Sequence, residues 1–346
     1  MSHFNVPYIN FGPSRYGYFC EMRMPKKTSF WAIGMKVSLS MVIVLVSRSG
    51  MYAQAPALPP TNLGLSDIYD GVAGEPGFVY QGYTQLYQTN HIYNANGDKT
   101  GSPLKVNSLL SLHQLIYLTP VKVLAGNLGF TVLVPIVKIT ATNISGPAPS
   151  VNPDVLGDIV EGTAIQWNDK KLFGKSFWHR LEVDVSIPVG SYNSNYAINA
   201  SSHLWAFSAY HAFTIFLNKN VTVSARNQFN YNFQIIDKPD KPGAYYNGNY
   251  SIAFSLWKNL KLEAAAYYLT QMVEDSYDGD HNYYQNRYQI PTTKQRVFGF
   301  GPGLAYFLPG GILFEGKVFF ETGAKNITQG TRPTFRIAIP FPGNEK

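Results

Sequence analysis

The sequence predicts an all-β protein whose strands close into a transmembrane antiparallel β-barrel of about 12 strands. Three features of the 346-residue chain lead to this fold class. Polar and apolar residues alternate in one segment after another, which is typical of strands with two different faces. The connections between these segments are alternately short and long, as in barrels with short periplasmic turns and long extracellular loops. The chain also begins with a leader of the secretory type.

Residues 1–55 form this leader, and we expect it to contain a signal peptide. Lysine residues precede the apolar run VSLSMVIVLV at residues 37–46. The tripeptide AQA at residues 53–55 fits the small-residue rule for cleavage. We therefore predict export, with cleavage after Ala55.

The leader also accounts for most of the excess positive charge. It holds six of the 28 basic residues but only one of the 21 acidic residues. The rest of the chain is nearly neutral and has no basic stripe, so we expect no nucleic-acid partner. The only cysteine, Cys20, lies in the leader, which leaves the exported chain without disulfides or thiolate ligands.

The exported chain divides into a segment at 56–76, a barrel at 77–341 and a tail at 342–346. Segment 56–76 is rich in proline and glycine, which excludes a long helix. We expect it either to lie in the periplasm or to fold into the barrel as a plug. Beyond it, twelve strands are predicted, an even number as a single-chain bacterial barrel requires. Their expected positions are 77–90, 104–118, 127–142, 158–168, 176–188, 203–217, 219–234, 246–257, 259–273, 294–308, 311–323 and 331–341.

The stretch VTVSARNQFNYNFQ at 221–234 shows the alternation most clearly. Its polar residues share one face and its Val, Phe and Tyr residues share the other, with Asn227 as the exception on the apolar face. Strands in soluble domains usually have about 5 to 6 residues, so the length of this one favours a tilted path through a bilayer. We expect the polar face to look into the barrel and the apolar face to contact lipid.

The polar faces carry few charges, and these have both signs. A soluble β-sandwich also alternates, but its polar face is outside and commonly rich in Lys and Glu. Sparse charges among Asn, Gln, Ser and Thr instead favour a hydrated lumen, where charged side chains could set charge selectivity. The expected lumen-lining residues are Glu182, Asp184, Arg226, Gln228, Lys261, Glu263, Glu315, Lys317 and Arg336.

The last predicted strand contains PTFRIAIPF, in which Phe335, Ile337, Ile339 and Phe341 share one face. This pattern resembles the C-terminal insertion signal of outer-membrane proteins, and it implies the barrel assembly machinery as a partner. The tail PGNEK follows Phe341, whereas the aromatic residue is usually the last one.

The sequence offers little support for catalysis or metal binding. There is no HExxH, no GxSxG and no nucleotide-binding fingerprint. An acidic run in the longest loop, at 274–281, could bind a divalent cation, but a solvated loop is the simpler interpretation. We therefore expect no enzyme activity, no metal and no cofactor.

Six segments, taken in order, carry a resemblance to a known family: EPGFVYQGYTQLYQTNHIYNANGD, LIYLTPVKVLAGNLGFTVLVPIV, LEVDVSIPVGSYN, AINASSHLWAFSAYHAF, LKLEAAAYYLTQMVEDSYDGD and RVFGFGPGLAYFL. They resemble the family of outer-membrane transporters associated with the meta-cleavage pathway of phenol degradation. The resemblance covers about residues 75 to 340. It implies transport of aromatic or other hydrophobic compounds across the outer membrane of a Gram-negative bacterium, with the lipid bilayer and a small solute as partners.

Three functions remain open from the sequence. The first is a channel for small, aromatic or hydrophobic solutes. The second is a structural or adhesive barrel that conducts nothing and binds a partner through its long loops. The third, which has the least support, is an outer-membrane enzyme.

Overall fold

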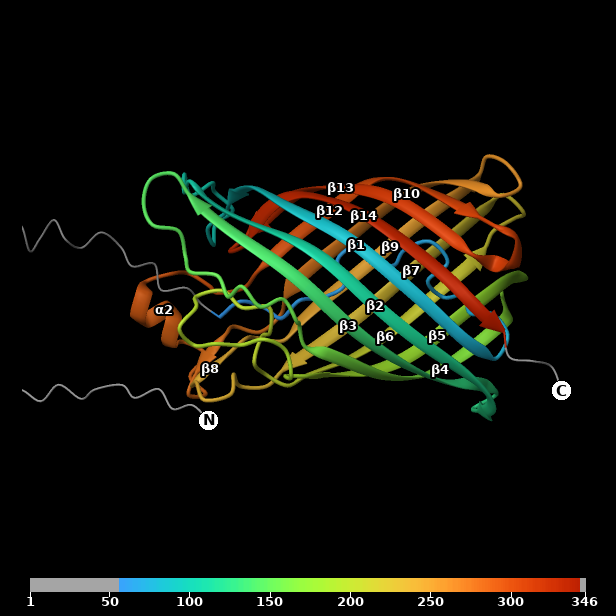
Figure 1. The fold of residues 1–346 in the computed structure, drawn as a ribbon, viewed down its shortest axis with the longest axis horizontal. Coiled ribbons are helices and arrows are strands. Elements are labelled where there is room, and N and C mark those ends of the chain that lie inside the picture. Colours follow the sequence, from blue (N-terminus) through green and yellow to red (C-terminus); the bar gives the residue numbers. More distant parts are fainter. Residues whose placement is uncertain (1–55, 343–346) are drawn as a thin grey trace, which may run out of the picture. The chain divides into compact units, whose positions relative to one another are not determined.

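The computed structural model describes residues 56–342, and twelve antiparallel strands in this range form a closed barrel (Figure 1). Each barrel strand pairs with its sequence neighbours, and the first pairs with the last to close the sheet. The predicted fold class and strand number are confirmed. The barrel strands are β1 (Gly77–Ile92), β2 (Leu104–Val123), β3 (Gly126–Asn143), β4 (Ile159–Leu172), β5 (Lys175–Ile187), β6 (Ala206–Phe216), β7 (Val221–Asn232), β9 (Tyr245–Ser255), β10 (Leu260–Gln271), β12 (Arg296–Phe307), β13 (Leu313–Lys325) and β14 (Thr328–Pro342).

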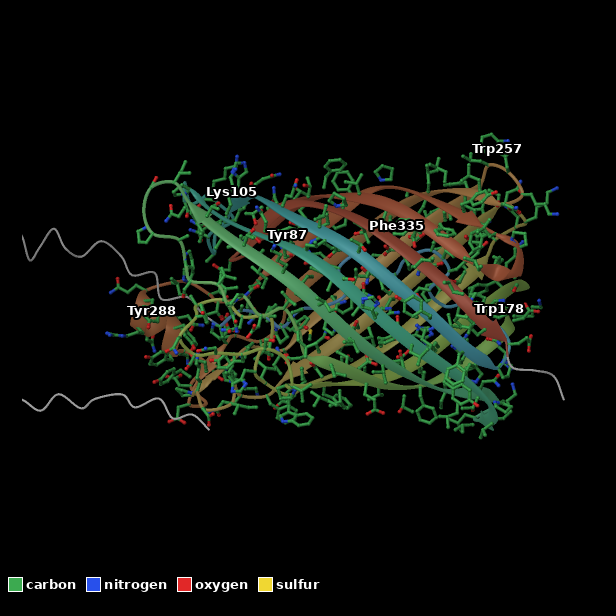
Figure 2. The ribbon with its side chains drawn as sticks, in the orientation of Figure 1. Tyr87, Lys105, Trp178, Trp257, Tyr288 and Phe335 are labelled. Carbon is green, nitrogen blue, oxygen red and sulfur yellow. The ribbon has the colours of Figure 1, made fainter. Side chains whose placement is uncertain are left out.

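The two ends of the barrel differ, as the alternating connections predict. Tight turns join strands at the end where Trp178 and Trp257 lie, and most of the long loops gather at the opposite end, near Lys105 and Tyr288 (Figures 1 and 2). We refer to these as the turn end and the loop end. The predicted leader, its cleavage after Ala55 and tail residues 343–346 lie outside the described residues.

Two long loops, one between β7 and β9 and the longest between β10 and β12, contain elements that the sequence did not predict. The short strands β8 (Asp240–Lys241) and β11 (Ser276–Tyr277) pair with each other outside the barrel sheet, and helix α2 (Tyr283–Tyr288) follows. Tyr284 of the helix is buried and donates a hydrogen bond to the Asp240 carboxylate. No helix within residues 56–342 is long and apolar enough to cross a membrane.

The outer face of the barrel is apolar, with the orientation predicted for residues 221–234. Thr222 and Gln228 of β7 are buried, whereas Phe229 and Tyr231 are exposed. Phe335 of β14 also lies on the outer surface (Figure 2). Other exposed side chains on this face include Leu109, Leu115, Phe130, Val132, Leu181, Val183, Ile252, Phe254, Leu262, Phe300, Leu304, Phe320 and Phe341.

Asn227, the exception on the apolar face, is satisfied by the neighbouring strand. It lies opposite Gly248 of β9, and two tyrosines of β9 flank that glycine. The Tyr246 hydroxyl donates to Asn227 Oδ1 at 2.7 Å, and the Tyr250 hydroxyl lies 3.4 Å from the same oxygen. An amide on this face is tolerated because the two phenols supply its hydrogen bonds.

The inner face has two chemically different walls. From β5 to β9 it carries the expected Ser, Thr, Asn, Gln and charged side chains. On β2 and β3, however, the inward positions near the loop end include Leu110, Leu112, Leu133 and Pro135. In this part of the barrel the two strands are therefore apolar on both faces, which differs from the polar lumen that the sequence predicted. Nearer the turn end their inward residues Gln114 and Thr131 are polar.

Candidate functional site

Segment 56–76 runs inside the barrel from the loop end to the turn end, where β1 begins (Figure 1, blue). Side chains of the wall satisfy its backbone in place of a strand partner. Asn247 and Asn249 of β9 both donate to the Asn62 carbonyl at 3.1 Å, and Gln85 of β1 donates to the Leu63 carbonyl at 3.0 Å. The segment is thus held by side chains from opposite sides of the barrel.

Two glycines let this segment approach the wall closely. Gly64 has a φ of +71°, and a Cβ at this position would meet the Phe319 ring at 2.3 Å. A Cβ on Gly71 would lie 2.3 Å from the Thr214 nitrogen of β6, and the Gly71 amide donates to Thr214 Oγ1 at 3.1 Å. Any larger residue at either position would push the segment away from the wall.

Asp70 anchors the segment to the polar wall. Arg226 of β7 donates to both Asp70 carboxylate oxygens, with both nitrogen–oxygen distances 2.7 Å. Arg180 of β5 lies 3.5 Å from the same carboxylate and 2.8 Å from Glu182. Tyr210 of β6 donates to Glu182, and its ring lies against the Arg226 guanidinium. This cluster joins the segment to three consecutive strands, and we call it the Asp70 cluster.

Asp67 is the second residue that anchors segment 56–76, and its cluster lies on β13 and β14. Its carboxylate lies 2.5 Å from Lys317 Nζ of β13, which is also 2.8 Å from Glu315. Arg336 of β14 pairs with Glu315 at 2.6 Å and donates to the Ile68 carbonyl at 2.9 Å. The buried side chains of Asp67, Glu315, Lys317 and Arg336 form the Asp67 cluster.

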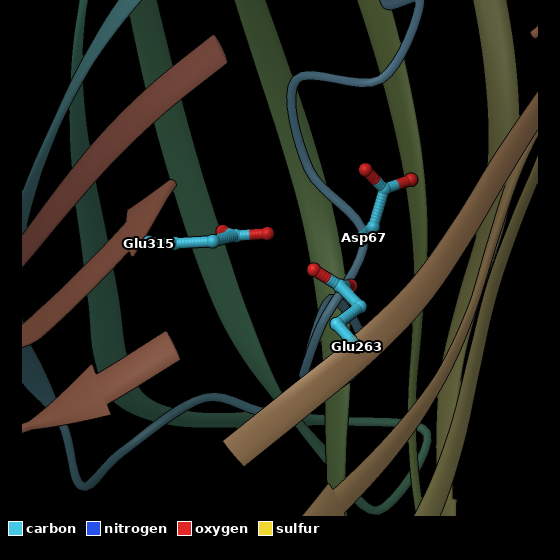
Figure 3. Close-up of side chains that lie close together, drawn as sticks. All are labelled: Asp67, Glu263 and Glu315. Atoms are coloured by element: carbon cyan, nitrogen blue, oxygen red, sulfur yellow. The ribbon is translucent and has the colours of Figure 1, made fainter. Parts of the chain in front are cut away.

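Glu263 of β10 completes an acidic group with Asp67 and Glu315 (Figure 3). One ligand atom of each carboxylate lies within 4.8 Å of the others, which is compatible with a metal site. The Lys317 ammonium, however, already contacts Asp67 and Glu315. The chain's own cation therefore serves the charge-balancing role that a metal ion would have here.

The nine predicted lumen residues all lie in the wall, but they are not equivalent. Arg226, Glu315, Lys317 and Arg336 take part in the two clusters that hold segment 56–76. Glu182, Asp184, Gln228 and Glu263 are buried beside them. Lys261, near the turn end, donates to Ser255 Oγ at 2.6 Å and lies 5.4 Å from the centre of the Tyr69 ring of the segment.

Sequence reasoning missed Asp67, Asp70, Arg180 and Tyr210. Arg180 and Tyr210 could have been found, because each lies on the inward face of its strand by the period of two. Asp67 and Asp70 carried no such signal, since segment 56–76 has no periodic pattern.

A third charged cluster, near the loop end, joins wall strands to one another. Glu321 of β13 accepts hydrogen bonds from Arg332 at 2.9 Å, from Tyr267 at 2.6 Å and from the Gly330 amide at 2.7 Å. Its side chain is fully buried. Tyr87 donates to the same carboxylate at 3.1 Å, so this buried group satisfies four donors.

Glu321→Gln is expected to lower the free energy of unfolding by about 2 kcal/mol, because the amide removes a buried charge from Arg332 and turns an NH₂ group towards donors. Urea unfolding in lipid vesicles measures this difference. Glu75→Gln, at an exposed carboxylate, is the matched control. Equal stability of the two variants would contradict a structural role for Glu321.

The acidic run of the longest loop is tied into hydrogen bonds within the loop. Glu274 accepts from Thr292 Oγ1 at 2.6 Å and from the Thr293 amide at 2.7 Å. Asp275 accepts from the Gly243 amide at 2.7 Å, and burial raises the pKa of Asp275 to about 6. These contacts order the loop and favour the structural interpretation of the run over a cation site.

A cavity of about 170 Å³ remains between segment 56–76 and the wall, in the half of the barrel nearer the loop end. Pro60, Asn62 and Leu65 of the segment border it on one side. Strands β1 to β7, Tyr245 of β9 and loop residues 157, 158, 200 and 202 provide most of the remaining lining. Within residues 56–342, segment 56–76 therefore fills part of the barrel interior and leaves this cavity beside it.

Comparisons with known proteins agree with this architecture. The family model described as "Putative MetA-pathway of phenol degradation" matches residues 89–337. The COG4313 outer membrane channel from Pseudomonas putida F1 is similar in structure, with a TM-score of 0.67 at 14% identity, over 80% of this chain and 100% of that one. This similarity shows the fold.

More distant structural matches include a deletion mutant of the TodX monoaromatic hydrocarbon channel, at 8% identity and a TM-score of 0.41, over 77% of this chain and 90% of that one. The CymD monoaromatic hydrocarbon channel matches at 8% identity and 0.40, over 79% and 90%. Neither match carries an argument about this chain. A comparison with curated protein sequences found no match.

Proposed function

We propose that this chain, which belongs to the family described as "Putative MetA-pathway of phenol degradation", is an outer-membrane channel. It would take up small aromatic or other hydrophobic compounds, because the family is described by the degradation of phenol. The apolar outer face supports placement in a bilayer, with strands long enough to cross it. The predicted leader and the C-terminal strand with Phe335 and Phe341 outside support export and insertion by the barrel assembly machinery.

The observation that carries this proposal is the way segment 56–76 occupies the lumen. The barrel sheet closes through the pairing of β1 with β14 and does not need the segment for closure. The segment is held by hydrogen bonds and ion pairs, which can break and reform. We propose that it is a movable plug and that a solute passes when it shifts.

In this proposal the charged residues predicted to line the lumen hold the plug when it is docked and line the open passage when it shifts. While the plug is docked, Arg226 and Lys317 pair with Asp70 and Asp67 of the plug. Once the plug shifts, these two cations face the lumen together with Glu182, Asp184 and Glu263. The mixed signs favour neutral solutes over ions of either charge.

Uptake by cells tests the proposal. Cells that make the full chain should accumulate a neutral phenol faster than cells that lack it, and purified protein should conduct ions in planar bilayers in brief events. A barrel that inserts, never conducts and leaves phenol accumulation unchanged would favour the structural or adhesive alternative.

A further inference from the structure

We propose that Glu263 binds one proton while segment 56–76 is docked, and that loss of this proton at higher pH favours release of the segment. This inference rests on the proposed plug and adds its regulation by pH. Two observations carry it: the charges around Glu263 balance only if it is neutral, and its buried carboxyl group has no hydrogen-bond donor.

Glu263 of β10 is buried inside the barrel without a donor. The residue is 1% exposed, and neither Oε1 nor Oε2 has a hydrogen-bond partner among the described residues. Gly303 of β12 leaves room for this carboxyl group, since a Cβ there would lie 2.7 Å from Oε2. An ionised carboxylate in this position would lose its hydration and gain no hydrogen bond in return, which is costly.

The surrounding charges do not balance an ionised Glu263. Asp67 and Glu315 carry two negative charges. Lys317 and Arg336, which pair with them, carry two positive charges. All four side chains are buried. The group is therefore neutral when Glu263 holds a proton, and it has one uncompensated negative charge when Glu263 is ionised.

The other elements around Glu263 add no charge that could compensate it. Strand β9 presents the uncharged Ser251, and β12 presents Gly303. Lys261, the next inward residue of β10 towards the turn end, donates instead to Ser255 Oγ at 2.6 Å. A proton is the charge that the chain itself does not supply.

The same proton supplies a donor where the plug lacks one. Asp67 Oδ1 is buried and has no hydrogen-bond partner within residues 56–342. An oxygen of Glu263 lies within 4.8 Å of an oxygen of Asp67 (Figure 3). A protonated carboxyl group has an O–H donor, so Glu263 can donate to the plug when the two groups approach.

A divalent cation is the alternative occupant of this group of carboxylates. Lys317 Nζ already lies 2.5 Å from Asp67 and 2.8 Å from Glu315, so a metal ion among them would face the ammonium group. Its two positive charges, added to those of Lys317 and Arg336, would also exceed the three negative charges. The charges and the position of Lys317 therefore favour a proton.

Release of the segment removes the reason for keeping the proton. Asp67 leaves with the segment, so the two cations of the wall then face only Glu315 and Glu263. Glu263 contacts water in this state and ionises as an exposed glutamate does, above about pH 4.3. The docked state thus binds one more proton than the released state. Docking should weaken as pH rises, by up to about tenfold per pH unit.

Infrared spectroscopy of the exported full chain in lipid vesicles detects this proton directly. At neutral pH the unmodified chain should show the C=O stretch of a protonated carboxylic acid that Glu263→Gln lacks. Asp67→Asn should lack the same band, because two carboxylates then face two cations and Glu263 can ionise. Glu161→Gln, at an exposed carboxylate of β4, is the matched control and should keep the band.

The pH dependence of docking is measured with a maleimide and a cysteine introduced at Ser66. This residue is buried in the docked segment, so Ser66→Cys reacts after release. Dividing its rate by that of Ser102→Cys, at an exposed loop position, cancels the pH dependence of the thiol itself. From pH 6 to pH 8 the normalised rate should rise at least about tenfold, and Glu161→Gln should not change this rise. With Glu263→Gln it should rise less than about twofold, because the amide stays neutral at every pH.

Absence of the carboxylic-acid band would overturn the bound proton, and faster labelling in the presence of a chelator would assign the carboxylates to a metal ion instead. A band together with labelling that does not depend on pH would overturn the link to docking. If Glu263→Gln does not fold, as judged by heat-modifiable migration on gels, Asp67→Asn tests the same band with a substitution outside the sheet.

Neither measurement uses conduction or uptake, so the two proposals can fail separately. A barrel that conducts but holds no proton at Glu263 refutes this inference alone. A barrel whose docking follows pH but which admits no phenol to cells refutes the channel function alone.

Discussion

Removal of residues 56–72 is expected to raise the single-channel conductance of the barrel by roughly tenfold or more, because a barrel of twelve strands without a plug leaves an aqueous lumen. The variant keeps its export signal and resumes at Ala73. The sheet should still close, since β1 pairs with β14 from Gly77 onwards. Planar-bilayer recordings of the two purified chains, at the same salt concentration, measure the difference.

A covalent lock on the same segment is the matched control. The side chains of Thr61 and Asn247 are joined by a hydrogen bond of 3.0 Å, which makes these two positions the pair at which to introduce cysteines and form a disulfide. Under oxidising conditions this variant should stay at low conductance, and a reductant should restore the behaviour of the unmodified chain. If the deletion variant is folded and yet conducts no better than the full chain, segment 56–76 is not the plug.

Much of this barrel could be predicted from the sequence, because the bilayer and the sheet impose a period of two. The strand from Val221 to Asn232 follows that period with Asn227 as its one exception, and it lies within the predicted range 219–234. The strand ends were predicted less accurately. Strand β2 continues to Val123, beyond the predicted residue 118, because its pairing with β3 includes Lys122 and Val123.

The interior was harder to predict, since its contacts join residues far apart in the chain. Asp70 and Arg226 are separated by 156 positions, and no local pattern relates them. Segment 56–76 has neither a strand nor a helix period, so the sequence excluded a long helix and left a periplasmic position and a plug as alternatives. The apolar inner wall could have been predicted from the sequence. The stretches LLSLHQLIYL in β2 and FTVLVPIV in β3 have apolar residues on the inward face as well as on the outward face.

Substitution of Asp70 with Ala is expected to weaken docking of the plug by about 3 to 5 kcal/mol, because it leaves Arg226 and Arg180 buried without their shared carboxylate. The side chains of these three residues are 5%, 11% and 14% exposed, so water can compensate little of the loss. The barrel itself should keep its stability, since Asp70 lies outside the sheet.

Labelling of a cysteine at Ser66 measures this undocking. Ser66 is buried in the docked segment, and residues 56–346 contain no cysteine. A maleimide should react with the Ser66→Cys chain slowly, and at least about a hundredfold faster when Asp70→Ala is added, as a loss of about 3 kcal/mol implies. Asp98→Ala, at an exposed loop carboxylate, should leave the rate unchanged.

Exchange of the two charges distinguishes pairing from a general disturbance of the fold. Asp70→Arg combined with Arg226→Asp restores opposite charges at the same two positions, and it should slow labelling relative to either single substitution. Arg180 keeps its contact with Glu182 in this variant, so part of the original cluster is retained. If the double variant is labelled as fast as Asp70→Ala, the Asp70 cluster does not hold the plug by charge pairing, and the backbone contacts of Asn62, Leu63 and Gly71 would have to account for docking.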